Sequence, residues 1–459
     1  MAAGAYVSRR VRRAGDFFVA GRSLSGGLVF VTLLAANIGA GSTVGATGLG
    51  YQHGLSAWWW SGSAAIGCLV LGLVVAPRMH RLAVERGLLT VGDFLEWRFD
   101  RSVRGLVAAI LWLGTLAILA GQLIAMAWAL DVVLALPKAW GCLLSGVVLV
   151  AYFSGGGLLA AAWVNLLQLA VLLLGFLLAV PYAMRAAGGW PAMQAAAGGD
   201  PAYASFTGMG WAGILGLAVI FVPSFIVSPG LIQKTFGART AAGARGAALG
   251  NAAALALFAF IPPLLGMAAR VLRPGLSNPE LALPSLMTMP EALPPWLGGL
   301  ALAALFAAEI STADAVLFML ATSLSQDLYK SFLNPSADDR RLLRVGRWTS
   351  VAAGALGVGL AILLPSVVDA LRTFYGVLTA TLFVPLLAGL LSSRPTARHA
   401  RAAIGVSLAV VLVSRAWLSG SALSAWLPFA AAIATGAVVI FLGGLTERIK
   451  SPAAARGKS

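Results

Sequence analysis

The sequence carries little charge and few cysteines or histidines. Of its 459 residues, 10% are charged and 59% are hydrophobic. A soluble protein cannot bury that much apolar surface, so the composition excludes a soluble enzyme or binding module. The two cysteines, Cys68 and Cys142, lie in apolar stretches without metal or redox spacing, which predicts packing residues. Because no nucleophile–base pair or metal constellation appears, we do not expect an enzyme.

Acidic residues are also scarce, since 16 Asp and Glu stand against 32 Lys and Arg and give a net charge of +16. On a soluble protein this excess would suggest nucleic acid. Here the basic residues fall in loops, where the positive-inside rule accounts for them, and we expect no nucleic-acid partner. The basic start SRRVRR is not followed by a compact apolar core with a cleavage site, so we expect no cleaved signal peptide.

Long apolar stretches are what the chain has instead, and its mean hydropathy is +0.89. Windows of about 20 apolar residues, long enough to cross a bilayer core of about 30 Å, recur along the chain. The sequence therefore predicts an all-α integral membrane protein with about twelve transmembrane helices. The predicted spans are 27–49, 55–77, 103–134, 138–156, 158–184, 211–230, 241–270, 296–329, 343–365, 367–392, 399–418 and 424–445.

The basic residues are distributed unevenly between the two sides of these spans. Of the 32 Lys and Arg, 26 fall on the side of the N-terminus and 6 on the other side. By the positive-inside rule, this split predicts an even number of spans and cytoplasmic N- and C-termini. The Ala- and Arg-rich, Lys-poor composition suggests a bacterial cytoplasmic membrane, with the lipid bilayer as a partner.

Two predicted spans contain residues that loosen a helix. The first includes ANIGAGSTVG, residues 36–45, and the sixth includes VPSFIVSPG, residues 222–230. Interrupted spans five apart, in opposite orientation, indicate an inverted-repeat transporter in which broken helices hold an ion and a solute. Close helix packing is the alternative explanation for the glycines.

The eighth span, 296–329, carries the strongest chemistry, because Glu309 and Asp314 lie in its middle. A carboxylate at the centre of a membrane helix costs on the order of 3 kcal/mol, so it needs a partner, a proton or an ion. At 100° per residue, Ala308, Ser311 and Thr312 share one face, which suits a hard cation bound together with backbone carbonyls. Alternatively, the two hydroxyls bond back to their own helix. The amides of Gln122 and Asn251, in spans 3 and 7, are expected to join neighbouring helices.

Several motifs resemble one transporter family. They are DFFVAGRSL (16–24), GATGLGYQHG in span 1, LLTVGDFLEWRFD (88–100), SPGLIQKTFGA (228–238), and LFAAEISTAD followed by QDLY. In this order and spacing they resemble the sodium:solute symporters, the group of sodium-coupled sugar, proline, pantothenate and monocarboxylate carriers. The resemblance runs from about residue 16 to 393. The family usually has another span before the first motif, whereas about 15 polar residues precede it here. That helix is either absent or truncated.

The resemblance implies a LeuT-type fold, a 5+5 inverted repeat of ten core helices with extra helices. The expected division is an N-terminal cytoplasmic segment (1–26), a transporter core (27–393), two additional C-terminal transmembrane helices (394–445) and a cytoplasmic tail (446–459). The core would consist of a first half (27–187) and a second half (211–393).

The same resemblance implies Na⁺ as the coupling ion. Its ligands would be the backbone carbonyls of Ala35, Ile38 and Ala308 and the hydroxyls of Ser311 and Thr312. Some members use the neighbourhood of Asp314 for a second sodium ion.

Two departures weaken that second site, because many members have Asp at the position of Asn165 and a small hydroxyl residue at the position of Ala315. We therefore expect one sodium ion, with Asp314 as a ligand or proton carrier. Asn165 and Glu309 complete the set of residues considered for a second ion or a proton.

The small-molecule solute is predicted from the residues that match the family's solute positions, Ser42, Ser61 and Ser228, together with Thr43. These small hydroxyls favour an organic acid or amino acid over a sugar, with a carboxylate at freed amides near 41–43. Two alternatives stay open: proton coupling through Asp314 or Glu309, and a transporter-like sensor without robust flux. The sequence does not indicate an oligomeric state.

Overall fold

The computed structural model describes residues 18–153 and 157–455, and regular structure in these ranges is helical apart from one isolated bridge between Leu24 and Ala238. The first half contains α3 (Gly26–Asn37), α4 (Ala46–His53), α5 (Trp58–Val70), α6 (Ala76–Arg86), α7 (Val91–Arg98), α8 (Arg101–Leu134), α9 (Lys138–Phe153), α10 (Gly157–Ala186) and α11 (Gly189–Ala195). The second half contains α12 (Gly210–Val227), α13 (Pro229–Phe236), α14 (Ala241–Phe258), α15 (Ile261–Leu272), α16 (Ala282–Met287), α17 (Pro295–Thr322), α18 (Asp339–Leu363) and α19 (Val367–Leu391). Two further long helices follow, α20 (Ala397–Trp417) and α21 (Leu427–Ala455).

Short 3₁₀ and wider π-helical turns connect or extend these helices. The 3₁₀ turns are η1 (Ala20–Arg22), η3 (Gly54–Ala57), η5 (Pro201–Ala204), η6 (Pro279–Leu281) and η8 (Ala422–Ala425). The π-helical segments are η2 (Gly41–Gly45), η4 (Leu71–Val75) and η7 (Ser323–Leu333). The sequence patterns did not predict the π-helical segments.

The described residues include 10 helices long and apolar enough to cross a membrane, and two shorter apolar helices, Gly26–Asn37 and Lys138–Ala151. These helices account for the twelve predicted spans, because one continuous stretch, Gly41–Arg86, holds the end of span 1 and all of span 2. The expected fold class, an all-helical membrane protein, is confirmed. The last candidate span, Leu427–Leu445, ends where the sequence predicted, although helix α21 itself continues to Ala455.

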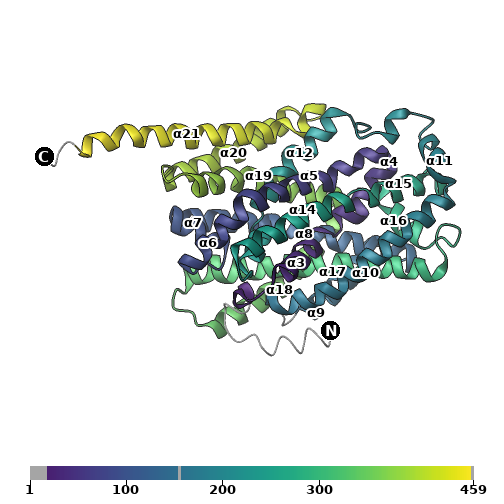
Figure 1. Cartoon of the computed structure of the whole chain (residues 1–459), viewed down its shortest axis with the longest axis horizontal. Helices are drawn as coiled ribbons and strands as arrows, with labels where there is room; N and C mark the ends of the chain where they lie inside the picture. The colour runs from purple at the N-terminus through teal and green to yellow at the C-terminus, as the bar shows by residue number, and fades with distance from the viewer. Residues whose placement is uncertain (1–17, 154–156, 456–459) are drawn as a thin grey trace.

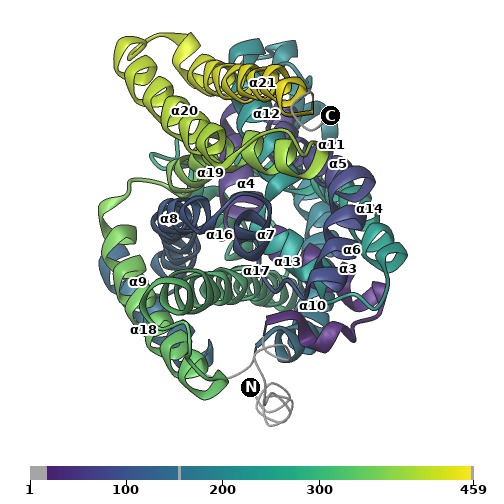
Figure 2. The same ribbon diagram turned by 90° about the vertical axis from the view of Figure 1, so that its left-hand side faces the viewer.

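The helices run roughly side by side along the long axis of the molecule (Figure 1). Seen end-on, α17 and α13 lie inside the bundle, whereas α20 and α21 lie at one edge (Figure 2). Helix α17 packs against α10, α8 and α3, and α12 packs against α5 and α19. Because spans 1, 6 and 8 meet in the interior, the two broken spans face the span that carries the carboxylates.

The break in the first span follows from its sequence. Helix α3 ends at Asn37, and Ile38 is extended, with φ −102° and ψ 94°, before the π-helical turn η2 begins. The last carbonyls of a helix lack helical partners, so this break releases the carbonyl of Ala35. Gly39 is required there, because a Cβ would clash with the Thr312 hydroxyl and lie 2.8 Å from Gln122 Oε1. The sixth span also breaks, since α12 ends at Val227 and the non-helical Ser228 leads into Pro229 of α13.

Candidate ion and solute site

Five oxygen atoms meet where the broken first span touches α17. Ser311 Oγ lies 3.0 Å from the carbonyl oxygen of Ala35 and 2.9 Å from that of Ala308. Thr312 Oγ1 lies 3.3 Å from the carbonyl oxygen of Ala35 and 3.2 Å from that of Ile38. We call these atoms the ion cluster: the carbonyl oxygens of Ala35, Ile38 and Ala308, Ser311 Oγ and Thr312 Oγ1. The structure thus brings together all five residues that the family resemblance implied as one ion site.

The residues of the ion cluster are buried, since even Thr312, the most accessible of them, has only 7% of its surface exposed to solvent. Its hydroxyls donate to carbonyls, so both could rotate to turn lone pairs toward a cation. Ser311 also bonds the carbonyl of Ala308 in its own helix, as the alternative interpretation predicted, whereas Thr312 bonds only to carbonyls of the first span. An all-oxygen donor set of neutral groups suits a hard cation.

The acidic residues of α17 lie beside the ion cluster and do not join it by hydrogen bonds. Glu309 is fully buried, and its Oε1 accepts a 2.8 Å hydrogen bond from Thr43 Oγ1, while its Oε2 has no hydrogen-bond partner among the described residues. Asp314 is half-buried and interacts electrostatically with Lys234 of α13. Asn165 of α10 is buried, and its Oδ1 accepts no hydrogen bond from the part of the chain that the structure describes. Within the described ranges no hydrogen bond links Glu309, Asp314 and Asn165 to one another.

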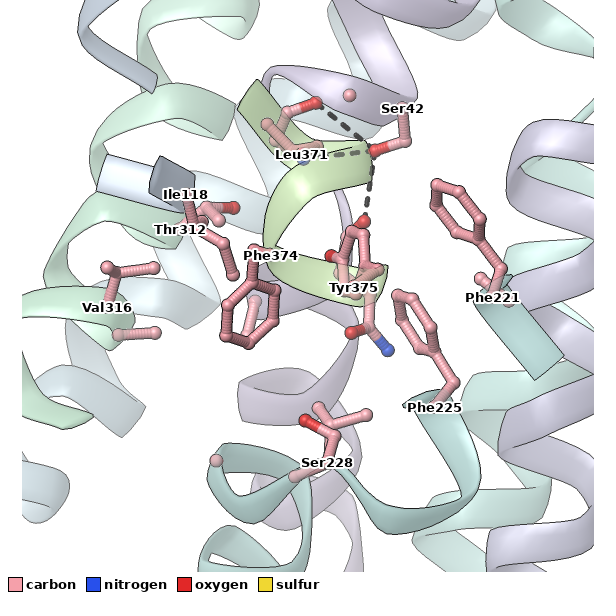
Figure 3. A pocket seen from close by; sticks show the side chains of 18 of the residues that line it. Ser42, Ile118, Phe221, Phe225, Ser228, Thr312, Val316, Leu371, Phe374 and Tyr375 are labelled. Carbon is pink, nitrogen blue, oxygen red and sulfur yellow. Dashed lines mark hydrogen bonds between the residues drawn. The ribbon is translucent and has the colours of Figure 1, made fainter. Parts of the chain in front are cut away.

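A cavity of about 80 Å³ lies next to the ion cluster, and we call it the solute cavity. Ser42, Ser61 and Ser228 line it as predicted, with Ser42 and Ser228 toward opposite ends of the view in Figure 3. Thr43 was predicted beside them but does not line this cavity, because its hydroxyl is bonded to Glu309 and to the carbonyl of Gly39. Gly39 and Thr312 line the solute cavity and also contact the ion cluster, so the two regions share a wall.

Most of the cavity wall was not predicted from the sequence. Figure 3 shows Phe221 and Phe225 of α12 on one side and Phe374 and Tyr375 of α19 beside them. The wall also contains Trp60, Gln122 and Lys234. The aromatic residues gave no separate signal because they suit any apolar span. The one available signal was Lys234, since a cation near the end of a membrane span marks a functional site by default.

Three amides at the break of the first span are already bonded, and one of them, that of Thr43, belongs to the amides near 41–43 that were expected to hold a carboxylate. The Gly39 amide donates to Ser42 Oγ at 3.0 Å, and the Ala40 amide donates to Gln122 Oε1 at 2.9 Å. The Thr43 amide donates to the carbonyl of Gly39. Gln122 therefore joins α8 to the first span, as predicted for an interhelical amide. A carboxylate would have to displace Ser42 or Gln122 to use the first two amides.

A second predicted interhelical amide is also confirmed. Asn37 Nδ2 donates to Asn251 Oδ1 at 3.1 Å, which joins the broken first span to α14.

Comparison with known proteins identifies the family. Residues 17–406 match the sodium:solute symporter family. The chain belongs to this family. The match agrees with the resemblance read from residues 16 to 393, and it supports Na⁺ as the coupling ion and a transporter rather than an enzyme. It also agrees with a multi-pass membrane protein.

Individual relatives of this symporter differ in their solutes. This chain is 27% identical over 437 residues to a sodium/glucose cotransporter of Vibrio parahaemolyticus, and the match covers 86% of this chain and 78% of that one. It is 29% identical over 419 residues to the sodium/pantothenate symporter of Escherichia coli, covering 86% and 84%. The structure of a substrate-bound, outward-open Na⁺-coupled sialic acid symporter matches with a TM-score of 0.80 and 20% identity, covering 98% of this chain and 95% of that one. At that identity the structural match shows the shared LeuT-type fold.

Two clusters of polar interactions, one around Arg104 and one around Glu280, join helices at opposite ends of the symporter, and we call each of them a closure. Near the start of α8, Arg104 forms ion pairs of 2.7–2.8 Å with Asp93 and Glu96 of α7 and with Asp327 of η7. At the other end, Glu280 Oε2 accepts hydrogen bonds from Trp128 Nε1 and the Val367 amide, both at 3.0 Å, and its Oε1 accepts one from the Val368 amide. Burial raises the pKa of Glu280, although these hydrogen bonds oppose the shift. Each closure therefore connects helices that flank the solute cavity.

Proposed function

We propose that this symporter couples inward Na⁺ movement to uptake of a small organic solute, an organic acid or amino acid rather than a sugar, by alternating access. The observation that carries the proposal is the ion cluster, which shares Thr312 with the solute cavity and lies beside Gly39 of the cavity wall. In this proposal one Na⁺ binds the carbonyls of Ala35, Ile38 and Ala308 and the hydroxyls of Ser311 and Thr312.

Coupling arises because the ion and the solute need the same arrangement of the first span. Na⁺ would hold Ala35 and Ile38 against α17, which fixes the break where Ser42 and Gly41 face the solute. Ordering that break before the solute arrives raises solute affinity, and by linkage the solute raises Na⁺ affinity by the same factor. Without Na⁺, the bonds of the ion to both helices would be lost, while the hydrogen bonds of Ser311 and Thr312 to the first-span carbonyls would remain.

The cavity wall supports the solute class. A sugar presents many hydroxyls and is typically held by bidentate amide or carboxylate side chains. The lining here offers Asn37 and Gln122, but Asn37 is bonded to Asn251 and Gln122 to the Ala40 amide. Ser42 Oγ already accepts a hydrogen bond from the Gly39 amide, so the hydroxyls of Ser61 and Ser228 remain, and they suit a solute with one polar end and an apolar body.

The two closures fit alternating access across a cell membrane. The excess of Lys and Arg around the Arg104 end, together with the positive-inside rule, supports a cytoplasmic position for this end and for both termini. The Glu280 end would then face outward. Breaking one closure while the other holds would open the solute cavity to one side at a time.

A thermal-unfolding and uptake screen tests this function. Purified protein is screened with organic acids, amino acids and sugars, each in Na⁺ and in K⁺, and the ligands that stabilise it are followed as uptake into proteoliposomes. We expect an acid or amino acid whose stabilisation and uptake require Na⁺.

Three results would contradict the proposal. A sugar as the only Na⁺-dependent ligand would refute the solute class. Uptake driven by a pH gradient without Na⁺ would replace sodium coupling by proton coupling. Ligand binding without flux would indicate a sensor.

A further inference from the structure

Lys234 is a buried cation on the wall of the solute cavity. It belongs to α13, the second half of the broken sixth span, and is 5% exposed. The residues that line the cavity include six aromatic side chains and several neutral polar groups, but no Asp, Glu, Arg or His. Lys234 is therefore the one charged side chain among the described residues that line the cavity.

The ammonium group of Lys234 is only partly satisfied. An ammonium has three donors, and one of these reaches the carbonyl oxygen of Thr32 at 3.1 Å. Asp314 is close enough to interact electrostatically, yet the ion pairs within the described ranges involve Arg104 and Arg401, and none includes Lys234. A buried charge with one neutral acceptor is costly, and a second, anionic acceptor would offset that cost.

The other residues of the cavity wall indicate which chemical group the anion is attached to. Trp60, Phe221, Phe225, Phe374 and Tyr375 surround the cavity, with the rings of Phe221 and Tyr375 4.8 Å apart and those of Phe225 and Tyr375 5.1 Å apart. This surface suits an apolar or aromatic body. An amino acid would also bring an ammonium group, for which the described wall provides no carboxylate.

We propose that Lys234 is the counter-ion for the carboxylate of the solute, which is a small monocarboxylate with an apolar body rather than an amino acid. This inference rests on the proposed symport function and assigns the anion to α13, since the amides of Gly39 and Ala40 in the first span are already bonded. The carboxylate would accept hydrogen bonds from the free donors of Lys234, and the apolar body would lie against the aromatic residues.

Matched pairs of acids and amides test this assignment. Benzoate, phenylacetate and butyrate are compared with benzamide, phenylacetamide and butyramide for stabilisation of the purified full chain in Na⁺. We expect at least one acid to bind about tenfold or more tightly than its amide, because only the acid gains a charge-assisted hydrogen bond. Lys234→Met should abolish this preference, whereas Lys234→Arg should keep part of it. Asp314→Asn, which removes the negative charge near Lys234, should leave acid binding unchanged or strengthen it.

The stabilisation by Na⁺ alone is measured in every variant and separates two kinds of failure. If Na⁺ stabilises Lys234→Met as it does the wild type, that variant is folded and its ion cluster is intact. If no acid then binds the wild type more tightly than its amide, or if Lys234→Met keeps the preference, the counter-ion assignment is wrong while sodium binding stands. Loss of the Na⁺ effect in the wild type would instead refute the proposed function.

Discussion

The ion cluster and the solute cavity meet at Gly39 and Thr312, yet they are built from different kinds of atoms. Three of the five oxygens in the ion cluster are backbone carbonyls, whose positions depend on where one helix ends and how another packs against it. The solute cavity is built from side chains of several spans, above all from aromatic rings. This difference suggests that one fold can keep a constant ion site while its solute changes, in line with the varied solutes of its relatives.

The largest effect on Na⁺ binding is expected when one oxygen is removed from the ion cluster. Ser311→Ala deletes the hydroxyl that lies between the Ala35 and Ala308 carbonyls. We expect the Na⁺ concentration for half-maximal thermal stabilisation to rise by about tenfold or more, because a buried cation loses one of five oxygens. Thr312→Ser, which keeps its hydroxyl, serves as the control and should change it little. Equal Na⁺ dependence in Ser311→Ala and wild type would contradict the ion cluster.

Two glycines on the shared wall should separate the regions. A Cβ at Gly39 would press on Thr312 and Gln122, whereas a Cβ at Gly41 would press on Leu371 and approach Trp60 Nε1 to 2.9 Å. We therefore expect Gly39→Ala to weaken Na⁺ binding strongly. Gly41→Ala should weaken solute binding and leave the Na⁺ stabilisation measured without solute near that of the wild type. Equal effects of both variants on Na⁺ and on solute, read from the same titrations, would show that the two regions are not distinct.

The difference between the two regions also explains what the sequence could predict. One side of the ion cluster was predictable because residues 308, 311 and 312 share one helical face, whereas Ala35 and Ile38 were implied by the resemblance to the symporter family. The cavity wall was not, because Phe221, Phe225 and Phe374 look like any lipid-facing or packing residue. Lys234 was counted among the loop cations. Thr43 was grouped with its neighbour Ser42, although adjacent helical residues point about 100° apart and Thr43 reaches Glu309.

A smaller effect is expected when Asn165 is replaced, and this variant tests how many sodium ions bind. If the symporter binds one Na⁺, Asn165→Ala should leave the dependence of uptake on Na⁺ hyperbolic, with a half-maximal concentration within about twofold of the wild type. The measurement is uptake at stepped Na⁺ concentrations. A change from a sigmoidal curve in the wild type to a hyperbolic one in the variant would reveal a second ion at this position.

The smallest effect is expected at Glu280, which should act on both regions equally. Because burial raises its pKa in the closed arrangement, protons bind the closed form more tightly than one in which Glu280 is exposed. Lowering the external pH should therefore favour closure and weaken the apparent binding of Na⁺ and of solute from outside by the same factor. Glu280→Gln should remove this pH dependence. Unequal factors for the two ligands would mean that Glu280 acts on one region directly.

Direct binding of radioactive sodium to the purified protein, without solute, tests the central claim. The account predicts saturable binding of one Na⁺ per chain that unlabelled Na⁺ displaces and K⁺ does not. It also predicts that Ser311→Ala loses this binding at the same concentration, whereas Lys234→Met retains it. Sodium binding that persists unchanged in Ser311→Ala would place the ion elsewhere and contradict the account.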